Sequence, residues 1–232
     1  MMKRILTIRL ALLIVCTLSI NTAFAQDEAL DFHEGLAAVK DSSGKWGYID
    51  KTGNMVIPCK WNWAFGFSEG LANVKDSSGK WGYIDKTGKV VIACQWNNTM
   101  YFSEGLACVT DSKRKCGFID KTGNIVIPCK WEWAMEFCEG LAWVKDSNGK
   151  YGYIDKTGNL FIPCIWDDTG SFCENLACVQ DASGKYGYID KSGNLVIPCI
   201  WNEAGGFSEG LACVQDANGK YVYIDKTGKV VK

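Results

Sequence analysis

Apolar and polar residues alternate in short segments along this chain, and each segment ends in a group of turn-forming residues. Residues 36–41 (LAAVKD), 45–50 (KWGYID) and 55–59 (MVIPC) are three such segments, separated by SSG and KTGN. Alternation with a period of two, in segments rich in valine, isoleucine and aromatic residues, is typical of β-strands, and no apolar spacing typical of a helix accompanies it. The pattern therefore predicts three short antiparallel strands joined by two tight turns.

The first turn is predicted from dipeptides that tolerate positive φ angles. Asn148-Gly149 and Asn218-Gly219 fit a two-residue type I′ hairpin, and Ser43-Gly44 is a weaker form of the same signal. This turn places Val39 opposite Tyr48, so that a small side chain faces a large one across the hairpin.

The second turn and the segment that follows it also carry local signals. Asp50 can accept hydrogen bonds from backbone N–H groups a residue or two further on, and Gly53 supplies the left-handed conformation. Pro58 cannot donate to a strand ladder, so strand pairing is expected to stop near it. Residues 59–67 (CKWNWAFGF) are then expected to cross to the next unit and to carry aromatic side chains that cover the sheet.

The same unit recurs every 35 residues. The phrase KWGYIDKTG at residues 45–53 returns in similar form at 80–88, 115–123, 150–158, 185–193 and 220–228, and an EGLA or ENLA element precedes each copy. Six units thus begin near residues 32, 67, 102, 137, 172 and 207. In such a repeat, each unit completes its hydrophobic core by packing against its neighbours.

We therefore expect an all-β tandem array of six antiparallel three-stranded β-meander units that stays open, like a solenoid. The first unit begins whole at Phe32 and the last copy ends within its third strand, so no strand is left over to close a ring. The alternative is a closed six-bladed propeller-like ring, because six is a common blade number and the crossing segment has room for a fourth strand.

Residues 1–25 stand outside the repeat and have the pattern of an export signal. Lys3, Arg4 and Arg9 are followed by an apolar run at residues 10–20 and by Ala-Phe-Ala at residues 23–25. We expect cleavage before Gln26, which leaves residues 26–232 as a single repeat domain. The predicted destination is the periplasm, the cell surface or the medium.

The charge balance and the apolar runs exclude two classes of partner. The chain has 25 basic and 26 acidic residues, and residues 1–25 hold three of the basic ones and none of the acidic, which leaves a net charge of −4. Proteins that bind nucleic acid are usually basic, so no nucleic acid is expected. Beyond residue 25, no apolar run approaches the roughly 18 residues of a spanning helix, so the protein is not expected to span a membrane.

Cysteines are the strongest candidates for chemistry. Removal of Cys16 with the signal leaves 11 of the 12 cysteines, and five of them recur at the repeat period, at residues 59, 94, 129, 164 and 199. If each unit adds three strands to one continuous sheet, these five lie about 14 Å apart, which is too far for disulfides. We interpret them mainly as small buried apolar groups; some disulfides in an exported chain, or a metal or redox role, are the alternatives.

The repeated phrase and the EGLA element together resemble the WG-containing repeat, also called the KWG repeat, of bacterial proteins. The resemblance covers all six units, and it implies a repeated antiparallel β unit in a non-enzymatic protein that mediates interactions. This chain departs from the family pattern where tryptophan is replaced, at Cys116, Tyr151, Tyr186 and Tyr221, and where glycine is replaced, at Val222. The resemblance carries no particular ligand to particular residues.

No catalytic residues, metal site or cofactor are predicted. The single histidine, His33, replaces a serine or cysteine of the other copies, and no catalytic set can be assembled around it. There is no C-x-x-C pair for zinc, and in the KTGN turn Lys51 directly follows Asp50, which does not suit a calcium loop. Enzyme is therefore the disfavoured class.

Aromatic residues are the evidence for binding. Trp63 and Trp133 occur in alternate copies, and Trp143 occupies a position that is alanine, asparagine or cysteine elsewhere, so these three are the candidate binding residues. A tryptophan in every unit, by contrast, is most simply core. We predict an exported, non-catalytic repeat protein that binds a protein or peptide; a glycan-binding surface protein and a cysteine-based redox or metal-binding protein are the alternatives.

Overall fold

The computed structural model describes residues 30–231, so the predicted export signal lies outside the described residues. These residues form six separate antiparallel sheets in chain order, the first of three strands and the other five of four. They contain no helix long and apolar enough to cross a membrane.

The strands are β1 (Leu36–Lys40), β2 (Trp46–Asp50) and β3 (Met55–Trp61); β4 (Trp63–Ser68), β5 (Leu71–Lys75), β6 (Trp81–Asp85) and β7 (Val90–Trp96); β8 (Asn98–Ser103), β9 (Leu106–Thr110), β10 (Cys116–Asp120) and β11 (Ile125–Trp131); β12 (Trp133–Ala134), β13 (Leu141–Lys145), β14 (Tyr151–Asp155) and β15 (Leu160–Trp166); β16 (Asp168–Thr169), β17 (Leu176–Gln180), β18 (Tyr186–Asp190) and β19 (Leu195–Trp201); and β20 (Glu203–Ala204), β21 (Leu211–Gln215), β22 (Tyr221–Asp225) and β23 (Val230–Val231).

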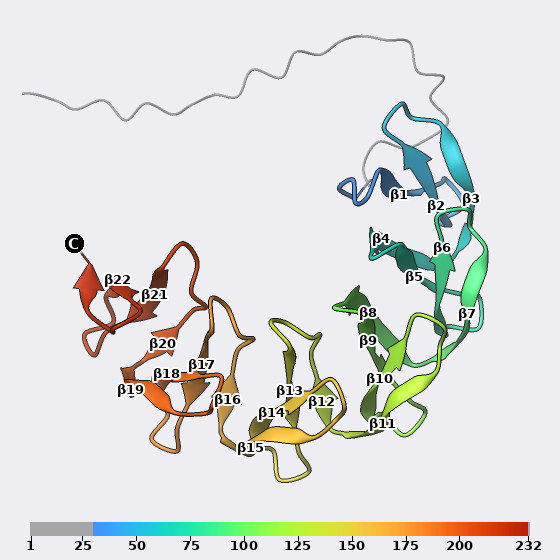
Figure 1. The fold of residues 1–232 in the computed structure, drawn as a ribbon. Coiled ribbons are helices and arrows are strands. Elements are labelled where there is room, and N and C mark those ends of the chain that lie inside the picture. The colour runs from blue at the N-terminus through green and yellow to red at the C-terminus, as the bar shows by residue number, and fades with distance from the viewer. Residues whose placement is uncertain (1–29, 232) are drawn as a thin grey trace, which may run out of the picture.

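The sheets stand side by side along an open arc (Figure 1). In each four-stranded sheet, the first strand, such as β4 or β12, lies on the concave side, and the last, such as β7 or β15, lies on the convex side. The two ends of the arc are apart, so the predicted open all-β array is confirmed and the ring is not formed.

The sheets have more strands than the three-stranded unit predicted, and they do not join into one continuous sheet. The crossing segment contributes the extra strand, because the residues after Trp61 pair with β5 as strand β4. Pro58 does not end pairing: it lies within β3, where a shift in register carries the pairing from Ile57 to Trp61. β3 is an edge strand, and a proline at an edge leaves no donor unpaired inside the sheet.

The first turn differs from the predicted type I′ hairpin. Asp41 donates its N–H to the carbonyl of Lys45 (2.8 Å), and its carboxylate accepts the N–H groups of Ser43 and Lys45 (both 2.9 Å). Only Gly44 has a positive φ (80°), whereas type I′ needs two such residues. The longer turn shifts the predicted register by one residue, so that Ala38, not Val39, pairs with Tyr48.

The second turn has the predicted chemistry. The carboxylate of Asp50 accepts the backbone N–H groups of Thr52 (2.8 Å) and Asn54 (3.0 Å), and Gly53 has a φ of 86°. The same arrangement of aspartate and left-handed glycine returns at Asp120 and Gly123.

The core lies between neighbouring sheets and not within any one of them. Tyr48 is fully buried, its ring lies 5.0 Å from that of Phe67 on the next sheet, and its hydroxyl donates to the carbonyl of Phe65 at 2.7 Å. Burial raises the pKa of Tyr48 well above its ordinary value. Tyr83, Tyr153 and Tyr188 make the same donation to the following sheet, so each unit depends on its successor for burial.

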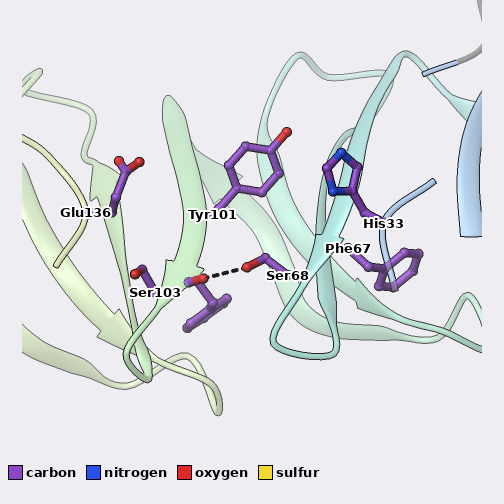
Figure 2. Close-up of a pocket in the computed structure, with 7 residues that line it drawn as sticks. His33, Phe67, Ser68, Tyr101, Ser103 and Glu136 are labelled. Carbon is purple, nitrogen blue, oxygen red and sulfur yellow. Dashed lines mark hydrogen bonds between the residues drawn. The ribbon is translucent and has the colours of Figure 1, made fainter. Parts of the chain in front are cut away.

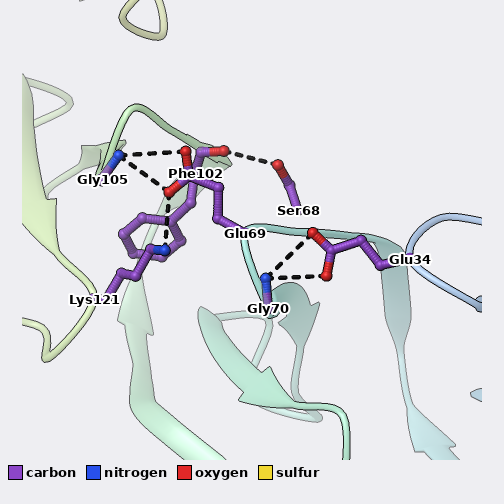
Figure 3. A network of polar contacts seen from close by, with 7 residues as sticks. All are labelled: Glu34, Ser68, Glu69, Gly70, Phe102, Gly105 and Lys121. Carbon is purple, nitrogen blue, oxygen red and sulfur yellow. Dashed lines mark hydrogen bonds and ion pairs between the residues drawn. The ribbon is translucent and has the colours of Figure 1, made fainter.

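Polar contacts between sheets repeat with equal regularity. Glu34, which has a φ of 50°, accepts the N–H of Gly70 (3.1 Å) and pairs with Lys86 (3.0 Å), both on the next unit. Figure 3 shows the bond from Gly70 to Glu34 and the equivalent ion pair of Glu69 with Lys121. Ser68 donates to the carbonyl of Phe102 at 2.8 Å. The remaining pairs of this ladder are Glu69–Lys121, Glu104–Lys156, Glu139–Lys191 and Glu174–Lys226.

The array is expected to lose stability in acid. The hydrogen bond from Lys86 holds the pKa of Glu34 below its ordinary value of 4.5, and the hydroxyl of Thr52 likewise lowers the pKa of Asp50. A carboxyl whose pKa is lower in the folded state stabilises the fold above its unfolded pKa, and this contribution disappears as the pH falls through the folded pKa. The urea concentration at the midpoint of unfolding should therefore be constant near neutral pH and should decrease when the pH is lower than about 4.5.

Two variants test this explanation. Glu34→Gln should flatten the acid side of the curve, whereas Glu209→Gln should leave it unchanged at concentrations where the protein is monomeric, because the Glu209 side chain has no polar partner within residues 30–231. An equal effect of both variants would contradict a role for the glutamate–lysine ladder.

A concave surface as the candidate functional site

The concave side of the array is formed by strands whose sequence differs from copy to copy. The turns and the inter-sheet core repeat, but three positions on the segments that contain the innermost strands do not. The first position holds Trp63, Asn98, Trp133, Asp168 and Glu203; the second holds Phe65, Met100, Met135, Gly170 and Gly205; the third holds Gly66, Tyr101, Glu136, Ser171 and Gly206. We call these fifteen residues, with His33, the concave surface.

Its first half is aromatic. The ring of Trp63 lies 5.1 Å from that of Trp46 and 6.2 Å from that of Phe65, which in turn lies 5.4 Å from Trp81 and 5.8 Å from Tyr101. Trp63 is 41% exposed and Tyr101 is 39% exposed. A continuous row of aromatic rings with exposed members offers a large apolar contact area at low cost in side-chain entropy.

A pocket of about 290 Å³ lies beside this row (Figure 2). His33, Tyr101 and Glu136 surround its opening, and Ser68 and Ser103 line it. The imidazole of His33 packs against Gly66 on β4 of the second sheet. The two are so close that a Cβ added to Gly66 would lie 2.5 Å from Cδ2 of His33. Burial raises the pKa of Tyr101, and the negative charge of Glu136 adds to this effect.

The second half of the surface is acidic. Asp168 accepts a hydrogen bond from the hydroxyl of Tyr186 (2.6 Å), and Glu203 accepts one from Tyr221. Burial raises the pKa of Tyr186, and the bond to Asp168 raises it further. Asp168 and Glu203 lie on the inner strands of the fifth and sixth sheets, and Glu136 lies two residues after the inner strand β12 of the fourth.

The structure separates the three tryptophans proposed from the sequence. Trp63 and Trp133 are both on the concave surface, on β4 and β12, and Trp133 is 49% exposed. Trp143 is half-buried on β13, where its ring meets Tyr151 at 5.5 Å and packs on the core between the fourth and fifth sheets. The three do not form one cluster.

Sequence reasoning missed other members of the surface. Phe65, Tyr101 and Glu136 were not singled out, although each occupies a position that varies between otherwise matching copies. This variation between copies could have identified them. Its meaning became clear only when the structure placed these positions together on the concave side.

The five recurring cysteines lie on the outer strands β3, β7, β11, β15 and β19, whereas Cys173 and Cys178 lie beside Gly206 and Gly170 of the concave surface. Within residues 30–231, all eleven cysteines are free thiols, and no group of three His, Cys, Asp or Glu side chains is arranged for a metal ion. Burial raises the pKa of Cys94 and of Cys129 to about 11. Cys108 and Cys116 are buried in the core between the third and fourth sheets, where a hydrogen bond from Cys108 lowers the pKa of Cys116.

The fold and this surface define a tandem β-repeat protein with a constant frame and one variable side. The model of the family described as "WG containing repeat" matches residues 46–80, 81–111, 117–151, 151–185 and 186–221. The chain therefore belongs to the WG-repeat family, as the repeated phrase indicated.

Solved structures with a similar fold differ widely in sequence. The computationally designed Ika8 protein has a TM-score of 0.56 at 13% identity, with 90% of this chain and 74% of that chain covered. BamB from Moraxella catarrhalis has a TM-score of 0.52 at 14% identity (87% and 73% covered), and Hsv2p of Kluyveromyces lactis has 0.51 at 10% (86% and 75% covered). These likenesses concern the fold alone. A search of curated proteins gave no match.

Proposed function

We propose that this protein is exported, has no catalytic activity, and binds a protein or peptide along its concave surface. The observation that carries the proposal is the separation of constant and variable residues. Residues that hold the array together repeat in nearly every copy, whereas the positions of the concave surface differ. Repeat proteins commonly use such extended concave surfaces for binding.

The chemistry of the surface indicates the partner. Aromatic residues such as Trp63 and Tyr101 favour apolar side chains, and the carboxylates of Glu136, Asp168 and Glu203 favour lysine or arginine. We propose a partner segment that lies along the arc with apolar residues against the second and third sheets and basic residues against the fourth to sixth.

The aromatic row supports one second candidate. A glycan chain can stack on exposed rings such as Trp63 and Trp133, but that mode gives the acidic half no role. A cysteine-based redox or metal function has less support, because the recurring thiols have raised pKa values and no metal-binding group occurs in residues 30–231. The protein's negative net charge disfavours nucleic acid.

Capture from the producing cell's own envelope and medium tests the proposal. The immobilised, processed protein should retain one or more proteins that are identified by mass spectrometry. Trp63→Ala and Glu136→Lys should each reduce the retained amount about tenfold or more, as expected for residues at the centre of an interface.

Phe161→Ala is the matched control, because Phe161 is 55% exposed but lies on the convex strand β15. Equal loss with all three variants, or equal retention, would contradict binding at the concave surface. Retention of polysaccharide with no protein would favour the glycan candidate.

A further inference from the structure

Each sheet has two chemically different faces, and at every junction one face of a sheet packs against the opposite face of the next sheet. The trailing face contains Tyr48 or its equivalent and contacts the following sheet; the leading face contains Phe67 or its equivalent and contacts the preceding one. Tyr188 and Phe207 make the last of these junctions, with ring centroids 4.9 Å apart.

The trailing face of the sixth sheet is exposed. Tyr223 is 57% exposed, whereas the equivalent Tyr188 is fully buried. Glu209 has a φ of 53°, the same as Glu174, so the two backbones share the left-handed conformation. Within residues 30–231, the side chains of Glu209 and Ser208 have no polar partner, although the equivalent Glu174 and Ser68 bridge other junctions.

The leading face of the first sheet carries the complementary groups. Phe32 is 46% exposed, whereas the equivalent Phe67 is 2% exposed. Lys51, the equivalent of Lys86, has no carboxylate partner among the described residues. Leu30 donates its N–H to the carbonyl of Ala38 at 3.0 Å, as Gly170 does to that of Cys178, so this segment follows the register of the inner segments of the other sheets.

We propose that the trailing face of the sixth sheet binds the leading face of the first sheet of a second copy of this chain. The contact repeats the junction already present between neighbouring sheets. Glu209 receives the N–H of Gly35 and pairs with Lys51 of the second copy, as Glu174 does with Gly210 and Lys226.

The other groups follow the same register. Ser208 donates to the carbonyl of Phe32 of the second copy, as Ser68 does to that of Phe102. Tyr223 donates to the carbonyl of Leu30 of the second copy, as Tyr188 does to that of Gly205. Complementary charge and continuity with the intramolecular junctions are therefore the two reasons to expect a second copy of this chain on the trailing face of the sixth sheet.

This contact is head to tail, because the two surfaces differ. A head-to-tail contact produces a ring if successive copies close on themselves and a filament if they do not. The arc is open and its ends are apart (Figure 1), so one chain does not satisfy its own two faces. The proposal is independent of what the concave surface binds.

Sedimentation velocity of the processed protein over a range of concentrations at low salt tests the contact. The wild-type protein should show mass that rises with concentration, and added salt should reverse the rise, because the Glu209–Lys51 pair is screened. Glu209→Lys and Lys51→Glu each place like charges at the junction and should raise the apparent dissociation constant about tenfold or more.

Mixing the variants gives the sharpest readout. In an equimolar mixture of Glu209→Lys and Lys51→Glu, both junctions between unlike variants bring opposite charges together, whereas each variant alone has like charges at its junctions. The mixture should therefore associate more strongly than either variant alone. The double variant should also recover association, but less than the wild type, because a lysine at position 209 does not accept the N–H of Gly35. Lys113→Glu, on the exposed tip of the hairpin after β9, is the control that leaves association unchanged, and circular dichroism confirms that each variant is folded.

Three results would overturn the proposal. They are a monomeric wild-type protein at every concentration, single variants that associate as the wild type does, and a mixture that is no larger than either variant alone.

Discussion

Gly117→Val is expected to lower the free energy of unfolding by at least about 4 kcal/mol, the range of severe core overpacking. Gly117 lies on β10 beneath the irregular part of β11. A Cβ at this position would be 2.5 Å from the carbonyl oxygen of Ile127 and 2.7 Å from the amide nitrogen of Cys129. Both atoms belong to the backbone, so no side-chain rotation relieves the contact.

The sixth sheet supplies the matched control. Val222 replaces this glycine, and the short strand β23 pairs only with Tyr223 and Ile224, so within residues 30–231 no outer backbone crosses over Val222. Val222→Gly should therefore change stability by about 1 kcal/mol or less. Urea unfolding followed by circular dichroism and tryptophan fluorescence measures both variants, and similar losses would show that the close backbone approach is not the cause.

Tyr153→Ala is expected to cost about 3–5 kcal/mol, as for other large buried side chains. Tyr153 is fully buried, its ring lies 4.8 Å from that of Phe172, and its hydroxyl donates to the carbonyl of Gly170 at 2.7 Å. The substitution removes apolar contact and a hydrogen bond from the same junction. Tyr153→Phe, which removes only the hydroxyl, should cost about 1–2 kcal/mol.

Tyr223→Ala is the control for this prediction. Tyr223 occupies the equivalent position but is 57% exposed, so its truncation should change stability by less than about 1 kcal/mol at concentrations where the protein is monomeric. Denaturant midpoints from two probes should agree; if Tyr223→Ala destabilises as much as Tyr153→Ala, the stability does not come from the junctions between sheets.

Local signals predicted the elements and their turns from the sequence alone. The alternation in LAAVKD and KWGYID and the left-handed glycine at Gly53 each act over a few residues, so a single copy was enough to recognise them. Six copies of the same pattern, 35 residues apart, then established the tandem all-β array and the family, because each copy repeats the same order of elements.

Predictions from the sequence were wrong where a side chain forms hydrogen bonds with the backbone of a turn, and where two segments of the chain pair with each other. The carboxylate of Asp41 caps the first turn and lengthens it, which moved the register by one residue. The crossing segment after Trp61 contains a strand because the backbone of β5 is there to pair with it, and no local pattern shows that partner.

The candidate site was predicted only in part for the same reason. Trp63 and Trp133 were chosen from the sequence because aromatic residues are conspicuous, and the structure places both on the concave surface. Trp143 was chosen because its position varies, yet it is half-buried against the next sheet. Variation alone does not distinguish an exposed position from a core position that its neighbour has adjusted to fit.

The sequence by itself determined the repeat, the strands, most of the turn chemistry and the family, since these depend on residues a few positions apart. Only the tertiary structure decided which strand of each sheet faces the concave side, which glycine lies under a backbone crossing, and that Glu34 pairs with Lys86 in the next unit. The first two features depend on how whole strands are arranged within a sheet, and the Glu34–Lys86 pair depends on the distance and angle between successive sheets. That geometry is fixed by the packing of whole faces such as Tyr48 on Phe67, which no short stretch of sequence specifies.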